Sequence, residues 1–120
     1  MDPIEPQVIP LAMLATEAAE TARDGVLWSL ASTDLNANLV RFPQGDGVEP
    51  HVNDEVDVLG VVVAGAGALL LDGREEPLRP GVAFFIPKGA RRAFRATTSE
   101  LVYLTCHRRR PALMPTRPPR

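Results

Sequence analysis

The residues best suited to chemistry lie between positions 51 and 57. His51, Asn53, Glu55 and Asp57 occupy alternate positions there. Successive side chains of a strand point to opposite faces, so an unbulged strand would place all four on one face. Imidazole and carboxylate groups bind divalent transition metals, and an amide can orient an imidazole or bind substrate. The pattern therefore predicts a polar site around His51.

The spacing of glycines around this segment is also informative. The residues that carry the spacing are Gly45, His51 and Gly65. The arrangement resembles the first motif of the cupin superfamily, G-x5-H-x-H-x3,4-E-x6-G, with Asn53 at its second histidine position. The glutamate position is Asp57 with the shorter spacer and Val58 with the longer one. The place of Gly65 favours Val58.

A second segment resembles the other cupin motif, G-x5-P-x-G-x2-H-x3-N. Gly81, Pro87 and Gly89 match it without a gap. Its histidine position is Arg92 and its asparagine position is Ala96. The resemblance spans about residues 35 to 106, and it keeps the glycine and proline frame better than the ligands.

The resemblance implies an all-β fold, a cupin-type β-barrel (double-stranded β-helix or jelly roll). In cupins that bind metal, three histidines and a glutamate project into the barrel, a set that suits a divalent transition metal. Here His51 matches without qualification, and Asp57 is the second possible ligand. Arg92 stays protonated and offers only donors. Because functional sites generally use three protein ligands, we expect no metal cofactor. The alternative is a divalent transition metal on His51 and Asp57.

An Asp57–Arg92 ion pair could take the place of the metal, or both residues could be solvated charges at the barrel rim. A guanidinium in the pocket would favour small anions, particularly carboxylates. Tyr103 or Trp28 could line the pocket or belong to the core, and His107 could be a pocket residue of the last strand. No catalytic residue is assigned. The candidate ligand-binding residues are His51, Asn53, Asp57, Arg92 and Tyr103.

The elements around these residues follow from periodicity and turn residues. Apolar positions at helical spacing predict a short N-terminal helix or turn over Leu11–Asp24, with Gly25 as its C-cap. Residues 43–50 read as an irregular lead-in to the site. Asp72-Gly73 predicts a type I′ hairpin turn, and Gly65 with Gly67 a tight turn between strands. The expected strands are 26–30, 35–42, 56–64, 68–72, 75–78, 82–86, 93–96 and 101–106.

The chain of 120 residues fits a single domain. We expect an N-terminal extension with a short helix at 1–25, the barrel at 26–107 and an Arg/Pro-rich tail at 108–120. The lone Cys106 precludes an internal disulfide and fits a reducing cytoplasm. A net charge of −2 argues against nucleic acid as a partner. The apolar run Val58–Leu71 is shorter than a membrane helix, and no signal peptide is visible, so we expect a cytoplasmic protein without membrane contact.

The strand after His51 is apolar on both parities. One parity carries Leu59, Val61 and Val63, and the other carries Val56, Val58, Gly60 and Val62. Such a strand is covered on both faces, and cupins commonly dimerise by sheet packing, so we expect a homodimer. The sequence favours a metal-free cupin that binds a small, anionic ligand without catalysis. The alternatives are a metal-dependent dioxygenase or isomerase using His51 and Asp57, and a protein-interaction module that uses its dimer surface and Arg-rich tail.

Overall fold

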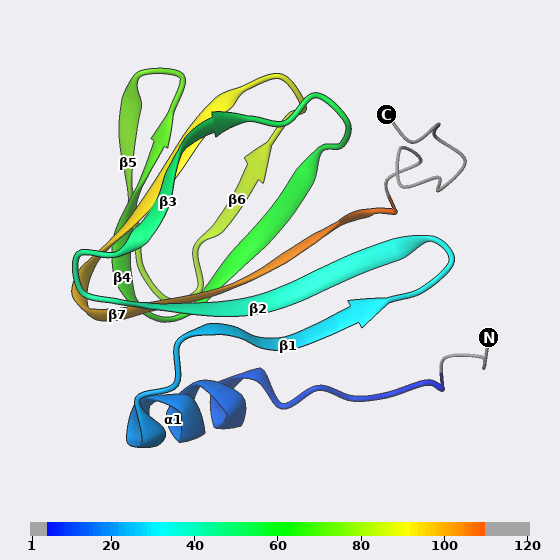
Figure 1. Cartoon of the computed structure of the whole chain (residues 1–120), viewed down its shortest axis with the longest axis vertical. Helices are drawn as coiled ribbons and strands as arrows, with labels where there is room; N and C mark the ends of the chain where they lie inside the picture. Colours follow the sequence, from blue (N-terminus) through cyan, green and yellow to red (C-terminus); the bar gives the residue numbers. More distant parts are fainter. Residues whose placement is uncertain (1–4, 110–120) are drawn as a thin grey trace, which may run out of the picture.

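The computed structural model describes residues 5–109 and contains one helix and seven strands (Figure 1). The helix is α1 (Leu11–Thr21). The strands are β1 (Gly25–Ala31), β2 (Leu35–Pro43), β3 (Gly47–Val52), β4 (Val58–Leu71), β5 (Arg74–Leu78), β6 (Ala83–Ile86) and β7 (Arg91–Arg108). The expected all-β architecture with a short N-terminal helix is confirmed. Within residues 5–109, no helix is long and apolar enough to cross a membrane.

Two long strands organise the sheet. β4 and β7 pair antiparallel along most of their lengths. They lie at the centre of a sheet whose main strand order is β1-β2-β7-β4-β5. At one end of this pair, the last part of β7 also pairs with β2 and the first part of β4 with β6. At the other end, the first part of β7 pairs with β3 and the last part of β4 with β5. The sheet bends sharply between these two sets of partners, so that its two halves face each other and stay apart at one end (Figure 1). We call the half with β1, β2 and β6 the lower half, and the half with β3 and β5 the upper half. These names follow the strand pairing and not the height of a strand in Figure 1.

The fold-over lies in the middle of β4, where we had expected a turn between two strands. That expectation was wrong: β4 and β7 run through as single bent strands, with register shifts at Val62/Ala64 and Gly65/Gly67. Gly65 has φ +74°, and a Cβ there would lie 2.0 Å from the backbone oxygen of Glu100. Gly65 is therefore required for a bend in β4 and for the close approach of β4 to β7. A glycine in a turn between two strands would give the same local sequence pattern, so the sequence could not separate the two cases.

The helix and the first hairpin turn test two further expectations. Ala15 and Ala18 are buried against the sheet, as the helical spacing predicted. The helix ends earlier than expected, because Ala22 takes the left-handed C-cap conformation (φ 52°) in place of Gly25. Asp72 and Gly73 have φ of 49° and 86°, which confirms the type I′ hairpin signal.

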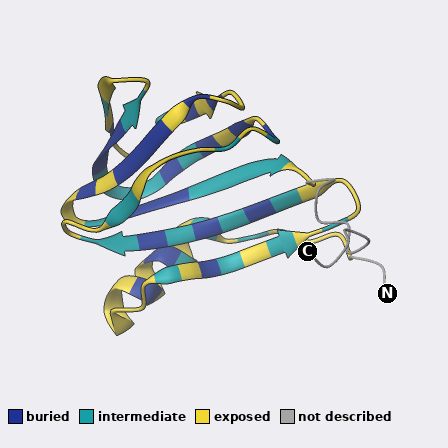
Figure 2. Ribbon diagram, turned by 45° about the horizontal axis from the view of Figure 1, so that its top comes forward, coloured by how far each residue is buried: buried dark blue, intermediate teal, exposed yellow. Residues whose placement is uncertain are grey.

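Two apolar clusters hold these layers. The larger lies between the two halves of the sheet and includes Val58, Val62, Phe84, Phe94 and Tyr103. The smaller lies between α1 and the outer face of the lower half, where Leu39 and Val102 are fully buried. Figure 2 shows the resulting alternation of buried and exposed positions along the strands. The space between the halves narrows to a packed core at the fold-over and opens at the opposite end.

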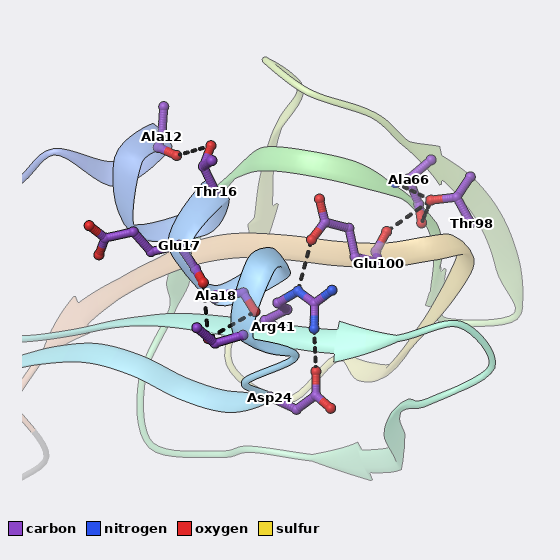
Figure 3. A network of polar contacts seen from close by, with 10 residues as sticks. Ala12, Thr16, Glu17, Ala18, Asp24, Arg41, Ala66, Thr98 and Glu100 are labelled. Atoms are coloured by element: carbon purple, nitrogen blue, oxygen red, sulfur yellow. Dashed lines mark hydrogen bonds and ion pairs between the residues drawn. The ribbon is translucent and has the colours of Figure 1, made fainter.

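A buried arginine ties the start of β1 to the central strands beneath the helix (Figure 3). Arg41 Nε donates to Glu100 Oε1 at 2.8 Å, and its Nη1 donates to Asp24 Oδ1 at 2.5 Å. The hydrogen bond to Glu100 is the main cause that raises the pKa of Arg41, although burial opposes it. The neighbouring Thr98 hydroxyl accepts from the backbone N–H of Ala66 at 3.0 Å, which pins the bend of β4 to β7.

Candidate functional site

A cavity of about 230 Å³ lies between the two halves of the sheet at the open end. Its lining residues are Asn38, Val48, His51, Asn53, Val58, Ile86, Arg92, Phe94, Tyr103, Thr105 and His107. Four of the five candidate ligand-binding residues are among them. The exception is Asp57.

The local backbone explains why Asp57 lies elsewhere. Residues 53–57 form a connection rather than a strand, and β4 begins at Val58. The connection shifts the parity, so that Val58 and Val62 are buried inside while Leu59 is exposed. The expectation that Asp57 and Leu59 share an inward face with His51 was therefore wrong. The cavity residue at the glutamate position of the motif is Val58, which the place of Gly65 had favoured.

Asp57 has a different structural role. Its Oδ1 accepts a hydrogen bond from the backbone N–H of Lys88 at 2.9 Å. Asp57 is absent from the residues that line the cavity, where Arg92 lies. The carboxylate instead ties the connection at the cavity rim to the turn that follows β6.

Arg92 lies on the upper wall of the cavity. It pairs in register with His51 across β3 and β7, so both side chains project from the same face. Arg92 is only 4% exposed. Its Nε donates to the backbone oxygen of Ala90 at 2.9 Å, and its Nη2 donates to that of Pro87 at 3.4 Å. No aspartate or glutamate occurs among the lining residues of the cavity. The upper wall therefore carries a buried guanidinium whose Nε and Nη2 are held by backbone oxygens.

Hydrogen bonds attach the connection at residues 53–57 to the neighbouring segments and so form the rim of the cavity. Gly89 N–H donates to the backbone oxygen of Asn53 at 2.7 Å. The side-chain oxygen of Asn53 accepts from the backbone N–H of Glu55 at 2.8 Å, which holds the start of the connection in a turn. Arg108 Nη2 donates to the backbone oxygen of Glu55 at 3.1 Å. Segments from both cupin-like motifs and from the last strand thus fix the entrance together.

The lower wall is polar near the mouth and aromatic further in. Asn38 on β2 lies directly opposite Thr105 on β7. His107 follows on the same face of β7, and its Nδ1 lies 2.8 Å from the backbone oxygen of Arg108. Because a carbonyl oxygen only accepts, Nδ1 must carry the proton, and Nε2 is the acceptor of the neutral ring. His51 has the same arrangement, with Nδ1 2.9 Å from the oxygen of Glu49.

Tyr103 forms the aromatic base of the cavity. Its ring stacks on Phe94 with centroids 4.6 Å apart, and it meets Phe84 edge-on at 5.7 Å. Burial raises the pKa of the Tyr103 phenol, so the group stays neutral at ordinary pH. Trp28, the other aromatic candidate, packs against the smaller cluster beneath α1 and does not line the cavity.

The side chains of the cavity do not fit a catalytic divalent metal. Within residues 5–109 no group of three or more histidine, cysteine, aspartate or glutamate side chains lies close enough to hold an ion. Of the four motif positions in the cavity, His51 alone is a usual ligand, beside Asn53, Val58 and Arg92. A permanent cation in a ligand position and an apolar side chain in another oppose metal binding by charge and by chemistry.

The comparison with protein families matches a cupin domain over residues 38–107. The chain belongs to the cupin family. KdgF from Halomonas sp. is 29% identical with a TM-score of 0.65, over 72% of this cupin and 81% of that chain. TT1209 from Thermus thermophilus shares the fold, with a TM-score of 0.71 at 23% identity over 88% of this cupin and the whole of that chain.

Two further proteins are similar to this cupin. A sugar phosphate isomerase of the cupin superfamily from Silicibacter pomeroyi is 26% identical, with a TM-score of 0.61 over 69% of this cupin and 59% of that chain. An uncharacterized protein from Aquifex aeolicus is 44% identical over 55 residues, or 46% of this cupin. The match spans only 45% of the length of that curated relative.

Sequence reasoning missed two polar residues of the cavity, Asn38 and Thr105. Both are polar positions on the inward parity of otherwise apolar strands, which is a usable signal once β2 and β7 are paired. His107, considered as a last-strand pocket residue, does line the cavity. Cys106 beside it lies at an apolar groove on the outer face, so the two side chains point apart as strand alternation predicted.

Proposed function

We propose that this cupin binds a small anionic molecule in its cavity without a metal cofactor and without catalysis. The observation that carries the proposal is Arg92, a buried cation on the wall of the cavity. Guanidinium groups bind carboxylates and phosphates through paired N–H donors, and these bonds strengthen away from water. An anion is the ligand that this wall would bind best.

The rest of the lining limits the size and character of the ligand. A cavity of about 230 Å³ is smaller than the roughly 300–1,000 Å³ of pockets for drug-sized ligands. The amide of Asn53 and the hydroxyl of Thr105 offer hydrogen bonds, while Tyr103 and Phe94 offer an apolar surface. A short carboxylic acid or a small phosphate ester fits this description. The likeness to a sugar phosphate isomerase supports the same class, since a sugar phosphate is an anion.

Titration calorimetry with malonate, succinate, glutarate and inorganic phosphate tests the proposal. Arg92→Gln should weaken binding by about 10- to 100-fold, because charge-assisted hydrogen bonds contribute about 1.5–3 kcal/mol. Arg95→Gln is the matched control, since Arg95 lies exposed on the same strand and outside the cavity. Anion binding that is equal in the two variants would refute the role of Arg92.

Elemental analysis tests the metal-free part of the proposal separately. Protein purified without chelators should carry no stoichiometric transition metal, because the cavity lacks a ligand set among residues 5–109. Finding one metal per chain, lost on His51→Ala, would favour a metal-dependent cupin enzyme instead.

A further inference from the structure

The lower half of the sheet extends further than the upper half on the β7 side of the cavity. Next to β7 the lower half carries β2 and then β1, whereas within residues 5–109 the upper half carries only β3 there. The residues of β1 that face the same way as the cavity wall, Val26, Ser29 and Ala31, are all exposed. The lower wall of the cavity therefore continues outward as an open surface over β2 and β1.

The strand register places polar side chains on this surface. Asn38 lies opposite Thr105 of β7 and opposite Ser29 of β1, and directly opposed residues share a face of the sheet. Asn36 likewise lies opposite His107. Because Asn38, Thr105 and His107 line the cavity, Asn36 and Ser29 lie on the same face just outside it. We call Ser29, Asn36 and Asn38 the β1–β2 shelf.

The β1–β2 shelf is polar but uncharged. Its two amides and its hydroxyl can each donate and accept hydrogen bonds. Among the residues described, none of the three side chains makes a hydrogen bond within the chain, so all three are open to a ligand. An ionised carboxylate only accepts, and it would leave the amide oxygens without a donor. A hydroxyl group both donates and accepts, so it can pair with each member of the shelf.

We propose that the β1–β2 shelf binds an uncharged, hydroxylated part of a ligand whose acidic group lies in the cavity. The inference rests on the proposed function, in which the cavity holds the acidic group. The shelf lengthens the binding site beyond the cavity of about 230 Å³, so the ligand can be longer than the cavity itself. The ligand class is then an acid with several hydroxyl groups along its chain, such as a polyhydroxy carboxylic acid or a polyol phosphate, rather than a plain alkyl acid.

Calorimetry with two pairs of acids tests the inference. Gluconate is compared with hexanoate, and glycerol 3-phosphate with propyl phosphate, because the members of each pair share a carbon chain length and differ in their hydroxyl groups. In the native chain the hydroxylated member should bind at least about tenfold more tightly, since two or three added neutral hydrogen bonds give roughly this factor.

The double variant Ser29→Ala/Asn36→Val separates the shelf from the cavity, because neither residue lines the cavity. It should reduce the preference for the hydroxylated acid to about twofold or less and leave the binding of hexanoate and propyl phosphate unchanged. Thr97→Val is the matched control, since Thr97 is an exposed hydroxyl residue of β7 that lies outside the cavity lining and the shelf. This control should keep the full preference.

A second measurement uses the native chain. The chain has three asparagines, so the side-chain NH₂ signal of Asn36 can be assigned by substitution in NMR spectra. Gluconate should shift this signal, whereas hexanoate should leave it unchanged. Hexanoate binding as tightly as gluconate, a preference that survives in the double variant, or an Asn36 signal that bound gluconate does not move overturns this inference while anion binding in the cavity stands. Absence of binding by every acid overturns the proposed function itself.

Discussion

Replacing Gly65 by alanine tests the bend that creates the cavity. Gly65 has φ +74°, and a Cβ there would lie 2.0 Å from the backbone oxygen of Glu100 and 2.6 Å from its carbonyl carbon. Real Cβ contacts are longer than about 3 Å, so β4 or β7 must move. The left-handed conformation costs an alanine about 1–2 kcal/mol, and overpacking typically adds about 1–3 kcal/mol. We expect Gly65→Ala to lower the free energy of unfolding by about 2–5 kcal/mol.

Gly73→Ala is a matched control for this prediction. Gly73 also has a positive φ, +86°, but nothing lies within 4 Å of a Cβ built there. Gly73→Ala should therefore cost only the conformational part, about 1–2 kcal/mol. Urea unfolding followed by Trp28 fluorescence compares the two variants, because Trp28 is the only tryptophan. Equal losses of stability would refute the close approach of β4 and β7, and with it the two-walled cavity.

Three other features give further predictions. Arg41→Gln should destabilise the fold by about 2–3 kcal/mol, because it leaves the half-buried Glu100 without its cation, whereas the exposed Arg74→Gln should cost less than about 0.5 kcal/mol in the same unfolding assay. Tyr103 is the only tyrosine, so absorbance at 295 nm should show its phenol titrating well above pH 10 in the folded chain, and a midpoint near 10 would contradict its burial. Since its pKa is raised on folding, stability that is present below pH 10 should fall as the pH rises above it, and Tyr103→Phe should remove this part of the fall in alkaline unfolding curves. We also propose that the chain forms a homodimer through the exposed outer face of β4, where Leu59 lines an apolar groove. In sedimentation experiments Leu59→Glu should yield monomers, whereas Leu35→Glu, which changes an exposed leucine outside the groove, should leave the dimer intact. A monomeric native chain would rule the dimer out.

The interaction module proposed from the Arg-rich tail depends mostly on residues 110–120, which lie outside the described part of the chain.

The groove on the outer face, lined by Leu59, Val61, Leu104 and Cys106 among others, is wholly apolar. It is the surface that the apolar alternation of β4 had indicated, although the parity is the reverse of the one expected. The helix covers only the part of this outer face near Val63 and Ala64.

Local patterns predicted those parts of the fold whose conformation is set by neighbouring residues. The turn at Asp72-Gly73 needs positive φ at both positions, and the buried stripe of α1 follows from helical spacing, so both could be predicted from the sequence. β3 was missed because Gly47 and Pro50 indicate an irregular segment, whereas pairing with β7 overrides the local preference. The same limitation turned two bent strands into four short ones.

The candidate site shows the same division between local and long-range information. His51, Asn53 and Arg92 were predicted because the glycine and proline frame sets their places relative to the turns. Asp57 was misplaced because its side depends on whether residues 53–57 continue a strand, and that is decided by bonds to distant residues, such as Lys88 N–H to Asp57 and Gly89 N–H to Asn53. Those bonds hold the connection off the sheet and shift its parity by one. A one-residue shift exchanges the two faces of the following strand. The exchange places Val58, rather than Asp57, on the wall of the cavity that Arg92 also lines.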